Sequence, residues 1–149
     1  MIGLVQRVTQ ASVSVEQHII GKIGYGALLL LGIEAHDSEL NVRKMVNKLI
    51  TFRMFTDHDG KMNWNIEQIK GDILVVSQFT LVADTTKGNR PGFSRGASPE
   101  HGEAMYDAFI IELRSRMCLP EIHVATGQFG ADMQVAMVND GPVTFSLHT

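Results

Sequence analysis

The sequence contains one cysteine, Cys118, among its 149 residues. A single thiol cannot form an internal disulfide, so a reducing compartment is expected. No apolar run approaches the roughly 20 residues that a membrane-spanning helix needs. The first ten residues, MIGLVQRVTQ, lack the basic and apolar regions of a signal peptide. We therefore expect a cytoplasmic protein that has no membrane partner.

Motifs for metals, nucleotides and activated serines are also missing. No two of the six histidines stand two or four residues apart, and neither a Walker loop nor a G-x-S-x-G motif occurs. We therefore expect neither a metal nor a cofactor. The formal net charge of −3 argues against binding nucleic acid through bulk electrostatics.

One short segment, TKGNRPGFSR, is basic. It contains Lys87, Arg90 and Arg95 without an intervening acid. Taken alone, such a segment is typical of a solvated surface loop. The alternative is a local patch that contacts nucleic-acid phosphates.

The pattern of the remaining residues predicts a mixed α/β fold. Hydrophobic residues make up 44% of the chain, enough for a single domain, residues 1–149, with a proper core. Alternating apolar residues near the N-terminus and the run ALLLLGI predict strands. Two helical segments follow, separated by a strand-like stretch, and the last third returns to strands. This order favours a sheet that packs against two helices.

Capping residues and apolar spacing define the two helices. The first should begin near Asp37 or Ser38, either of which can accept from its free N–H groups. The second should begin at Ser98, with Pro99 at its first position. The predicted buried faces are Val42, Met45, Val46, Leu49 and Ile50 in the first helix, and Met105, Phe109, Leu113 and Met117 in the second.

Polar residues interrupt the most strand-like stretch, DILVVSQFTLVA, which begins at Asp72. Ser77, Gln78 and Thr80 could be ordinary strand residues whose side chains bond to the backbone. Alternatively, the strand opens here into a pocket and offers N–H groups and the Thr80 hydroxyl to a substrate carbonyl, as an oxyanion site requires. No histidine or carboxylate stands nearby in the sequence to activate Thr80, which leaves the identity of a base open.

A second unusual stretch is MQVAMVNDGPVTFSL, residues 133–147. Its apolar residues favour a strand, yet proline is normally excluded from central strands. Asp-Gly between strand-like residues is typical of a hairpin turn, which is the reading that the segment favours by itself. The alternative is a backbone device in which a Gly141-Pro142 bond, cis or trans, presents its carbonyl groups.

The motifs SQFTL, KGNRP and NDGPVT together resemble those of D-aminoacyl-tRNA deacylases, the D-tyrosyl-tRNA(Tyr) deacylase family. The resemblance extends over essentially the whole chain, from MIGLVQRVTQASV through GADMQV to the C-terminus. One departure lies in the basic loop, where Gly92 stands at a position that is often serine in the family.

The resemblance implies a fold, an assembly and a reaction. The fold is a single compact domain with a mixed, mostly antiparallel sheet and two helices, and it forms a two-fold homodimer. Each subunit inserts a cis Gly141-Pro142 pair into its partner's pocket beside SQFTL. The substrates are D-aminoacyl-tRNA and glycyl-tRNA, whose ester to the 3′-terminal adenosine is hydrolysed to free tRNA and amino acid. L-aminoacyl-tRNA is rejected because its side chain meets rigid backbone, whereas a hydrophobic pocket discriminates by only about 1–3 kcal/mol per methylene.

The resemblance also implies roles for particular residues. The expected catalytic residues are Ser77, Gln78, Phe79 and Thr80, of which Phe79 and Thr80 supply N–H donors to the oxyanion. The expected substrate-binding residues are Met133, Asn139, Gly141 and Pro142. The expected tRNA-binding residues are Lys87, Arg90 and Arg95.

Two questions stay open at this point. The nucleophile is either Thr80 or a water that the substrate's 2′-hydroxyl helps to activate, and the absence of a base beside Thr80 favours the second. The net charge of −3 also keeps two other functions in view, a non-catalytic dimeric tRNA-binding module and a hydrolase of small aminoacyl esters.

Overall fold

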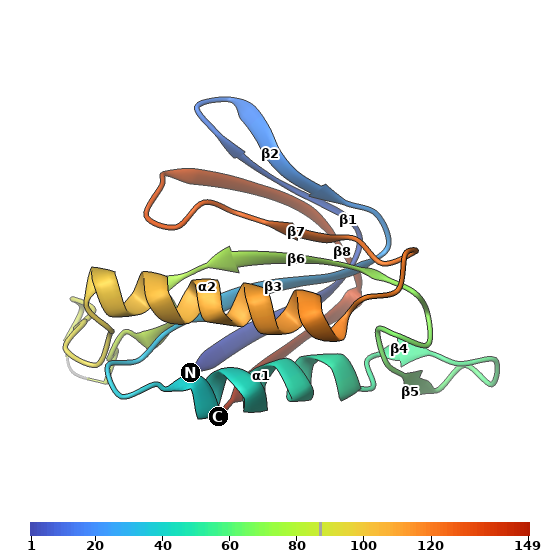
Figure 1. Cartoon of the computed structure of the whole chain (residues 1–149), viewed down its shortest axis with the longest axis horizontal. Helices are drawn as coiled ribbons and strands as arrows, with labels where there is room; N and C mark the ends of the chain where they lie inside the picture. Colours follow the sequence, from blue (N-terminus) through green and yellow to red (C-terminus); the bar gives the residue numbers. More distant parts are fainter. Residues whose placement is uncertain (87) are drawn as a thin grey trace.

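Two helices cover one face of a strongly curved β-sheet (Figure 1). The computed structural model describes residues 1–86 and 88–149. The elements in chain order are β1 (Ile2–Val15), β2 (His18–Ile23), β3 (Gly26–Gly32), α1 (Glu39–Thr51), β4 (Phe55–Thr56), β5 (Met62–Trp64), β6 (Asp72–Ser77), the 3₁₀ helix η1 (Phe79–Val82), α2 (Pro99–Arg116), β7 (Val124–Thr126) and β8 (Met133–His148). Lys87 lies outside the described residues.

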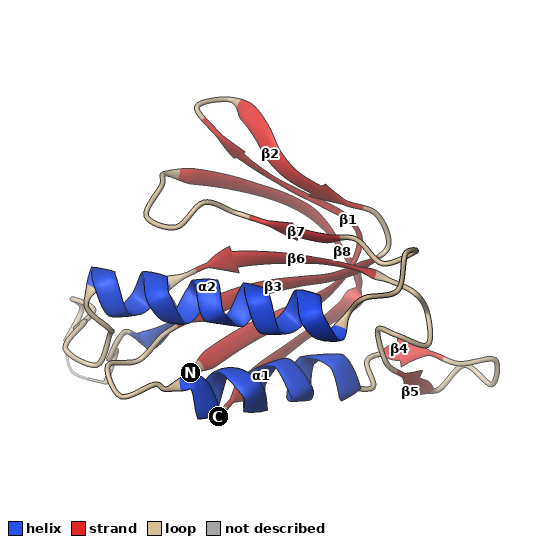
Figure 2. Ribbon diagram, viewed as in Figure 1, coloured by secondary structure: helices blue, strands red, loops and turns tan. Residues whose placement is uncertain are grey.

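The main sheet has the order β2-β1-β3-β6-β7, and β8 also pairs with β1 (Figure 2). β1 is antiparallel to β2, β3 and β8, whereas β6 is parallel to both β3 and β7. β4 and β5 form a separate two-stranded hairpin. The predicted mixed, mostly antiparallel sheet with two helices is therefore confirmed.

Both helices begin where their capping residues predict. Ser38 is the N-cap of α1, and the five apolar residues predicted to form its inner face are buried. The Ser98 side chain accepts from the N–H of His101 at 3.3 Å, and Pro99 opens α2. Of the apolar residues predicted on α2, only Met105 is partly rather than fully buried.

The alternation of side chains along β6 places apolar residues on both faces of the sheet. Ile73 and Val75 pack into the larger core beneath the helices. Leu74 and Val76 point the other way, into a smaller core that residues of β1, β2 and β7 complete. A strand covered on both faces gives a rigid support for whatever follows its carboxyl end.

Two expectations about strands are wrong. β6 ends at Ser77 instead of continuing through SQFTL, because the chain turns into η1, where the N–H of Leu81 bonds to the carbonyl of Gln78 at 3.3 Å. NDGP makes no hairpin either. It lies inside β8, which pairs with β1 along its length and is only locally irregular there. Among the described residues, no helix is long and apolar enough to cross a membrane.

Candidate functional site

A cavity of about 460 Å³ opens at the carboxyl end of β6. Its walls come from segments far apart in the sequence: the turn into η1, the start of α2 with the residues before it, and the start of β8 with the loop before it. The lining residues include Ser77, Gln78, Phe79, Phe93, residues 96–99, residues 129–131 and Met133. The second reading of SQFTL, in which a pocket begins here, is the one that this geometry favours.

The end of β6 is tied down on two sides. The N–H of Gln78 donates to the carbonyl of Leu31 in β3 at 2.8 Å. One layer deeper, the hydroxyl of Tyr106 in α2 donates to the carbonyl of Val75 at 3.0 Å. Burial raises the pKa of Tyr106 to about 12, so this donor stays protonated at neutral pH. The floor of the cavity is therefore held to both the sheet and α2.

The first turn of η1 presents unused hydrogen-bond donors. The N–H groups of Phe79 and Thr80 precede the first intrahelical bond, so η1 itself cannot satisfy them. Neither N–H donates a hydrogen bond to another of the described residues. Phe79 lines the cavity, whereas Thr80, the next residue, is exposed and lies outside the lining.

The Thr80 hydroxyl has an amide as its neighbour. The side-chain Nε2 of Gln78 donates to Thr80 Oγ1. An amide cannot accept the proton that a nucleophilic hydroxyl must lose. None of the described residues that line the cavity has an ionisable side chain, and no three His, Cys, Asp or Glu side chains in the described ranges gather closely enough to hold a metal ion. The cavity thus offers dipoles and apolar surface.

Aromatic side chains surround the cavity. Phe79 is 67% exposed, and its ring centroid lies 5.2 Å from that of Phe93. Deeper in the wall, the Phe129 ring lies 5.9 Å from the ring of Tyr106. A Cβ on Gly102 would approach Phe129 Cζ to 3.1 Å, so the glycine gives that ring its space. Phe79 and Phe93 leave an aromatic surface open to solvent.

The Gly141-Pro142 pair lies elsewhere on the chain surface. Its peptide bond is cis, as the second reading of NDGP allows, and both residues are exposed. Gly141 has a φ of +118°, in a region that L residues with side chains rarely adopt. A Cβ there would also lie 2.8 Å from Val143 Cγ2 and 3.1 Å from Arg7 Nη2. Two independent geometric reasons therefore require glycine at this position.

Side chains hold the residues around this pair. Asn139 accepts from the N–H of Val143 at 3.2 Å and donates to Thr144 Oγ1 at 2.9 Å. The buried Arg7 donates to the carbonyl of Met54 at 3.0 Å. Its Nε lies 2.9 Å from Asp140 Oδ2, an ion pair whose angle falls outside hydrogen-bond geometry. Residues 139–142, named here the Gly-Pro segment, are thus fixed to the body of the chain.

The Gly-Pro segment and the cavity are far apart within one chain. Asn139 follows Met133 by six residues along β8, a separation of about 20 Å at the normal strand rise. Asn139, Gly141 and Pro142 do not line the cavity that the described residues form. The structure therefore brings together Ser77, Gln78, Phe79 and Met133, and leaves the other predicted substrate-binding residues outside.

Of the two described cations in the basic segment, Arg95 is paired with an acid. Arg90 is exposed, whereas Arg95 Nη2 forms an ion pair with Glu34 Oε1 at 2.8 Å. Asp84, just before this loop, accepts from the hydroxyl and the N–H of Thr86, and these bonds lower the pKa of the Asp84 carboxyl. The segment has no acid of its own, but the fold supplies Glu34.

Sequence reasoning missed three residues that shape these two regions. Phe93 lies within the basic segment, which was interpreted only by its charged residues. Phe129 lies between Gln128 and Gly130 in a loop, a pattern with no distinctive signal. Arg7 stands within the apolar alternation of β1, and a cation at a buried strand position was a readable sign of a charged partner nearby.

Comparison with known proteins decides the family. The sequence pattern of the D-Tyr-tRNA(Tyr) deacylase family matches residues 4–148. The chain belongs to this family. It is 63% identical over 145 residues to a D-aminoacyl-tRNA deacylase of Alteromonas mediterranea, covering 97% of each chain. It is 55% identical over 148 residues to a protein of the same name from Pseudoalteromonas atlantica, covering 99% of each chain.

Two solved structures share the fold of this chain. A structure named c-Myc DNA Unwinding Element Binding Protein is 41% identical and superimposes with a TM-score of 0.94, over 100% of this chain and 99% of the other. A probable eukaryotic D-amino acid tRNA deacylase, 20% identical, superimposes with a TM-score of 0.81 over 98% of both chains. The second likeness shows the fold alone. The resemblance read from SQFTL, KGNRP and NDGPVT is confirmed.

Proposed function

We propose that the cavity at the end of β6 binds the 3′-terminal aminoacyl-adenosine of tRNA and that its ester bond is hydrolysed there. The family match and the names of relatives that the chain covers almost completely support this proposal. The protein is a D-aminoacyl-tRNA deacylase, a hydrolase. The products are free tRNA and a D-amino acid.

The proposed mechanism rests on one observation. The described lining of the cavity has no ionisable side chain, but the N–H groups of Phe79 and Thr80 at its edge are unused donors. Water attacks the ester carbonyl, and the N–H groups of Phe79 and Thr80 stabilise the oxyanion that forms. A donor of this kind is worth roughly 2.7–4 kcal/mol. Ser77 and Gln78 hold the turn in shape.

The proton transfers then use the substrate itself. The 2′-hydroxyl of the terminal adenosine helps to take a proton from the attacking water, and the 3′-oxygen leaves with a proton. Thr80 is a poor candidate for the nucleophile because its hydroxyl is bonded to the Gln78 amide, which cannot act as a base. Positioning and electrostatic stabilisation are then the protein's contribution.

The aromatic surface beside the cavity suits the adenine ring. Phe79 and Phe93 are exposed aromatic residues of the cavity lining, and Met133 adds apolar surface to the wall. Stacking of a base on an aromatic side chain contributes about 1–3 kcal/mol. The ester is then proposed to lie near the N–H groups of Phe79 and Thr80 at the start of η1. Arg90, Arg95 and Lys87 of the basic segment are proposed to contact the tRNA phosphates beyond the terminal nucleotide.

Stereochemical selection is assigned to the Gly-Pro segment of a second subunit. Its backbone is exposed, held by Arg7 and Asn139, and about 20 Å from the cavity of its own chain. In a two-fold homodimer, each segment can enter the partner's cavity. Its carbonyls then accept from the substrate ammonium group, and an L side chain would strike rigid backbone. Glycine has no side chain to clash, so glycyl-tRNA is accepted.

Two alternatives make different predictions. A non-catalytic tRNA-binding module would bind D-aminoacyl-tRNA without hydrolysing it. A hydrolase of small esters would cleave D-aminoacyl-adenosine as fast as the full tRNA substrate. Rates on these two substrates separate the three functions, and we expect the full tRNA to be preferred. We place this activity in the cytoplasm, where aminoacyl-tRNA is found.

The test of the proposed function compares the enantiomers of one amino acid on one tRNA. Purified protein should hydrolyse D-aminoacyl-tRNA carrying several different side chains, together with glycyl-tRNA, and leave the L forms essentially intact. Comparable rates on the D and L forms would contradict backbone-based selection. Absence of hydrolysis with intact binding would favour the binding module.

A further inference from the structure

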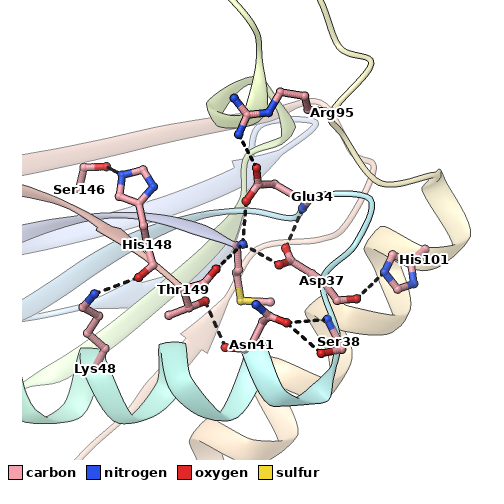
Figure 3. Close-up of polar contacts among 11 residues, drawn as sticks. Glu34, Asp37, Ser38, Asn41, Lys48, Arg95, His101, Ser146, His148 and Thr149 are labelled. Atoms are coloured by element: carbon pink, nitrogen blue, oxygen red, sulfur yellow. Dashed lines mark hydrogen bonds and ion pairs between the residues drawn. The ribbon is translucent and has the colours of Figure 1, made fainter.

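The amino group of Met1 is buried in a cluster of charged groups. Figure 3 shows Glu34 and Asp37 of this cluster, with Arg95 bonded to Glu34. The Met1 nitrogen lies 2.6 Å from Asp37 Oδ1, 2.9 Å from Glu34 Oε2 and 3.2 Å from the carbonyl oxygen of Thr149. The Met1 side chain has no exposed surface. An ammonium group has three N–H donors, and these contacts account for all three.

The two carboxylates are fixed by further partners. Asp37 Oδ2 accepts from the N–H of Glu34 at 2.7 Å. Glu34 Oε1 accepts from Arg95 Nη2 at 2.8 Å. The Met1 ammonium, with a smaller contribution from Arg95, lowers the pKa of Glu34. The Met1 ammonium therefore pairs with both side-chain carboxylates, whereas Arg95 pairs with Glu34.

This cluster lies directly behind one wall of the cavity. The N–H of Ala35 donates to the carbonyl of Arg95 at 3.0 Å, and the N–H of Ala97 donates to the carbonyl of Ile33 at 3.2 Å. Ile33 and Ala97 both line the cavity. The carbonyl of Asp37 also contacts His101 Nε2 at 2.9 Å, close to the first residues of α2, which line the cavity as well. Residues 33–35, which follow β3, are thus bonded to residues 95–97 at the cavity wall, at the point where the Met1 ammonium pairs with Glu34.

We propose that the free amino group of Met1 is a positioning group for the 96–99 wall, and that acylation or extension at this nitrogen impairs the site. A formyl or acetyl group converts the ammonium into a neutral amide with a single donor. Glu34 and Asp37 would then face each other with Arg95 as their one cation, and an uncompensated buried charge is strongly unfavourable. A peptide extension has the same effect, because it moves the charge away.

A reaction must then precede full activity in any chain made with N-formylmethionine. That reaction is hydrolysis of the formamide: water adds, the C–N bond breaks, formate leaves, and the released nitrogen takes up a proton. Loss of the methionine would also disrupt the cluster, because its nitrogen and its buried side chain both belong to it.

The experiment compares chains that differ only at this nitrogen. A fusion cut immediately before Met1 gives the free amino group, and a fusion that leaves Gly-Ser before Met1 gives the extension. Protein made in cells whose peptide deformylase is inhibited keeps the formyl group on Met1. Glu34→Gln weakens the same cluster without touching the N-terminus. Glu121→Gln is the matched control, since it breaks an exposed ion pair with Lys70, also 2.9 Å long, outside the cluster and the cavity wall.

The extended, formylated and Glu34→Gln proteins should show a KM for D-aminoacyl-tRNA raised about tenfold, because small misplacements in a site reduce binding and rate steeply. The amide protons of Ala35 and Ala97 should exchange faster with solvent in all three. Glu121→Gln should match the free chain in both measurements. Unchanged KM and exchange in the extended and formylated proteins would overturn the proposal.

The kinetic readout rests on the proposed deacylase function, whereas the exchange readout does not. A free chain without deacylase activity would defeat the proposed function, and the exchange comparison would still decide the role of the ammonium. If the extended protein does not fold, Glu34→Gln decides instead, and wild-type exchange at Ala97 in that variant contradicts the proposal.

Discussion

The cavity at the end of β6 and the Gly-Pro segment are opposite in character. The cavity is a hollow of about 460 Å³, apolar in most of its wall and without ionisable groups among its described lining residues. The segment is exposed backbone on a strand, held by an ion pair between Arg7 and Asp140. In the proposed function, the cavity holds the ester and the adenine, and the Gly-Pro segment supplies the rigid backbone that distinguishes D from L substrates.

Each region therefore supplies what the other lacks. Their separation of about 20 Å along β8 prevents them from meeting within one chain. The proposed two-fold dimer would bring the Gly-Pro segment of each chain to the cavity of its partner, and so make two complete sites. The predictions below test the two regions separately, beginning with the largest effect.

The largest effect is expected in a test of whether the protein supplies a proton acceptor for the attacking water. D-aminoacyl-tRNA ending in 2′-deoxyadenosine should bind almost as well as the natural substrate and react about 10³-fold more slowly, since a positioned proton acceptor contributes roughly 10²–10⁴-fold. Single-turnover hydrolysis and competition binding measure the two quantities. Rapid hydrolysis of the deoxy substrate would mean that the protein supplies the base.

The second prediction concerns the Gly-Pro segment. Gly141→Ala should lower kcat/KM for D-aminoacyl-tRNA about 100-fold, because displacement of a substrate-positioning element by about 1 Å has effects of this size. The reason is steric: the φ of +118° is unfavourable for alanine, and the added methyl would press on Val143 and Arg7. Gly60→Ala is the control. Gly60 also has a positive φ, +77°, but nothing within 4 Å, and this variant should keep its activity.

The third prediction returns to the cavity. Phe79→Ala should raise KM for D-aminoacyl-tRNA about tenfold, as expected for the loss of one base-stacking contact. The backbone N–H of residue 79 survives this change, so kcat should fall less. Ile111→Ala removes a comparably exposed apolar side chain, 70% exposed on α2, and should leave KM unchanged. A larger fall in kcat than in affinity would assign Phe79 a role in the chemistry.

The smallest effect is expected at Thr80. Thr80→Ala removes the hydroxyl that Gln78 contacts but keeps the backbone donor, so the rate should fall only a few-fold, well below the loss seen when a nucleophile is removed. Burst and steady-state kinetics on D-aminoacyl-tRNA provide the measurement. A folded variant that binds substrate but hydrolyses it at the uncatalysed rate would make Thr80 the nucleophile.

The two regions also differ in how much the sequence could predict. Local rules were sufficient for the helices: Ser38 and Ser98 cap them, and the apolar spacing identifies their inner faces. The Gly-Pro segment is contiguous, so its motif could be read directly. Its hairpin interpretation is wrong because the neighbouring strand β1, far away in the sequence, keeps β8 paired on both sides of the irregularity.

The cavity was harder to predict because its walls converge from distant segments. Ser77, Gln78 and Phe79 were found from one motif, but Phe93 and Phe129 reach the same hollow only through the fold. The end of β6 was also placed too late, since residues 79–82 have strand-like composition and tertiary contacts decide the turn. Pairing of Arg95 with Glu34 joins residues 61 positions apart, a contact that no local pattern contains.

Complementation between two defective subunits tests most directly whether one site is built from both regions. Gly141→Ala damages the segment, and Ala97→Phe fills the cavity that Ala97 lines. Each homodimer should be nearly inactive. After dissociation and random reassociation, half of the dimers contain one chain of each kind and one intact site of two, so about a quarter of wild-type activity should return. A mixture no more active than its two components would contradict a site shared between subunits.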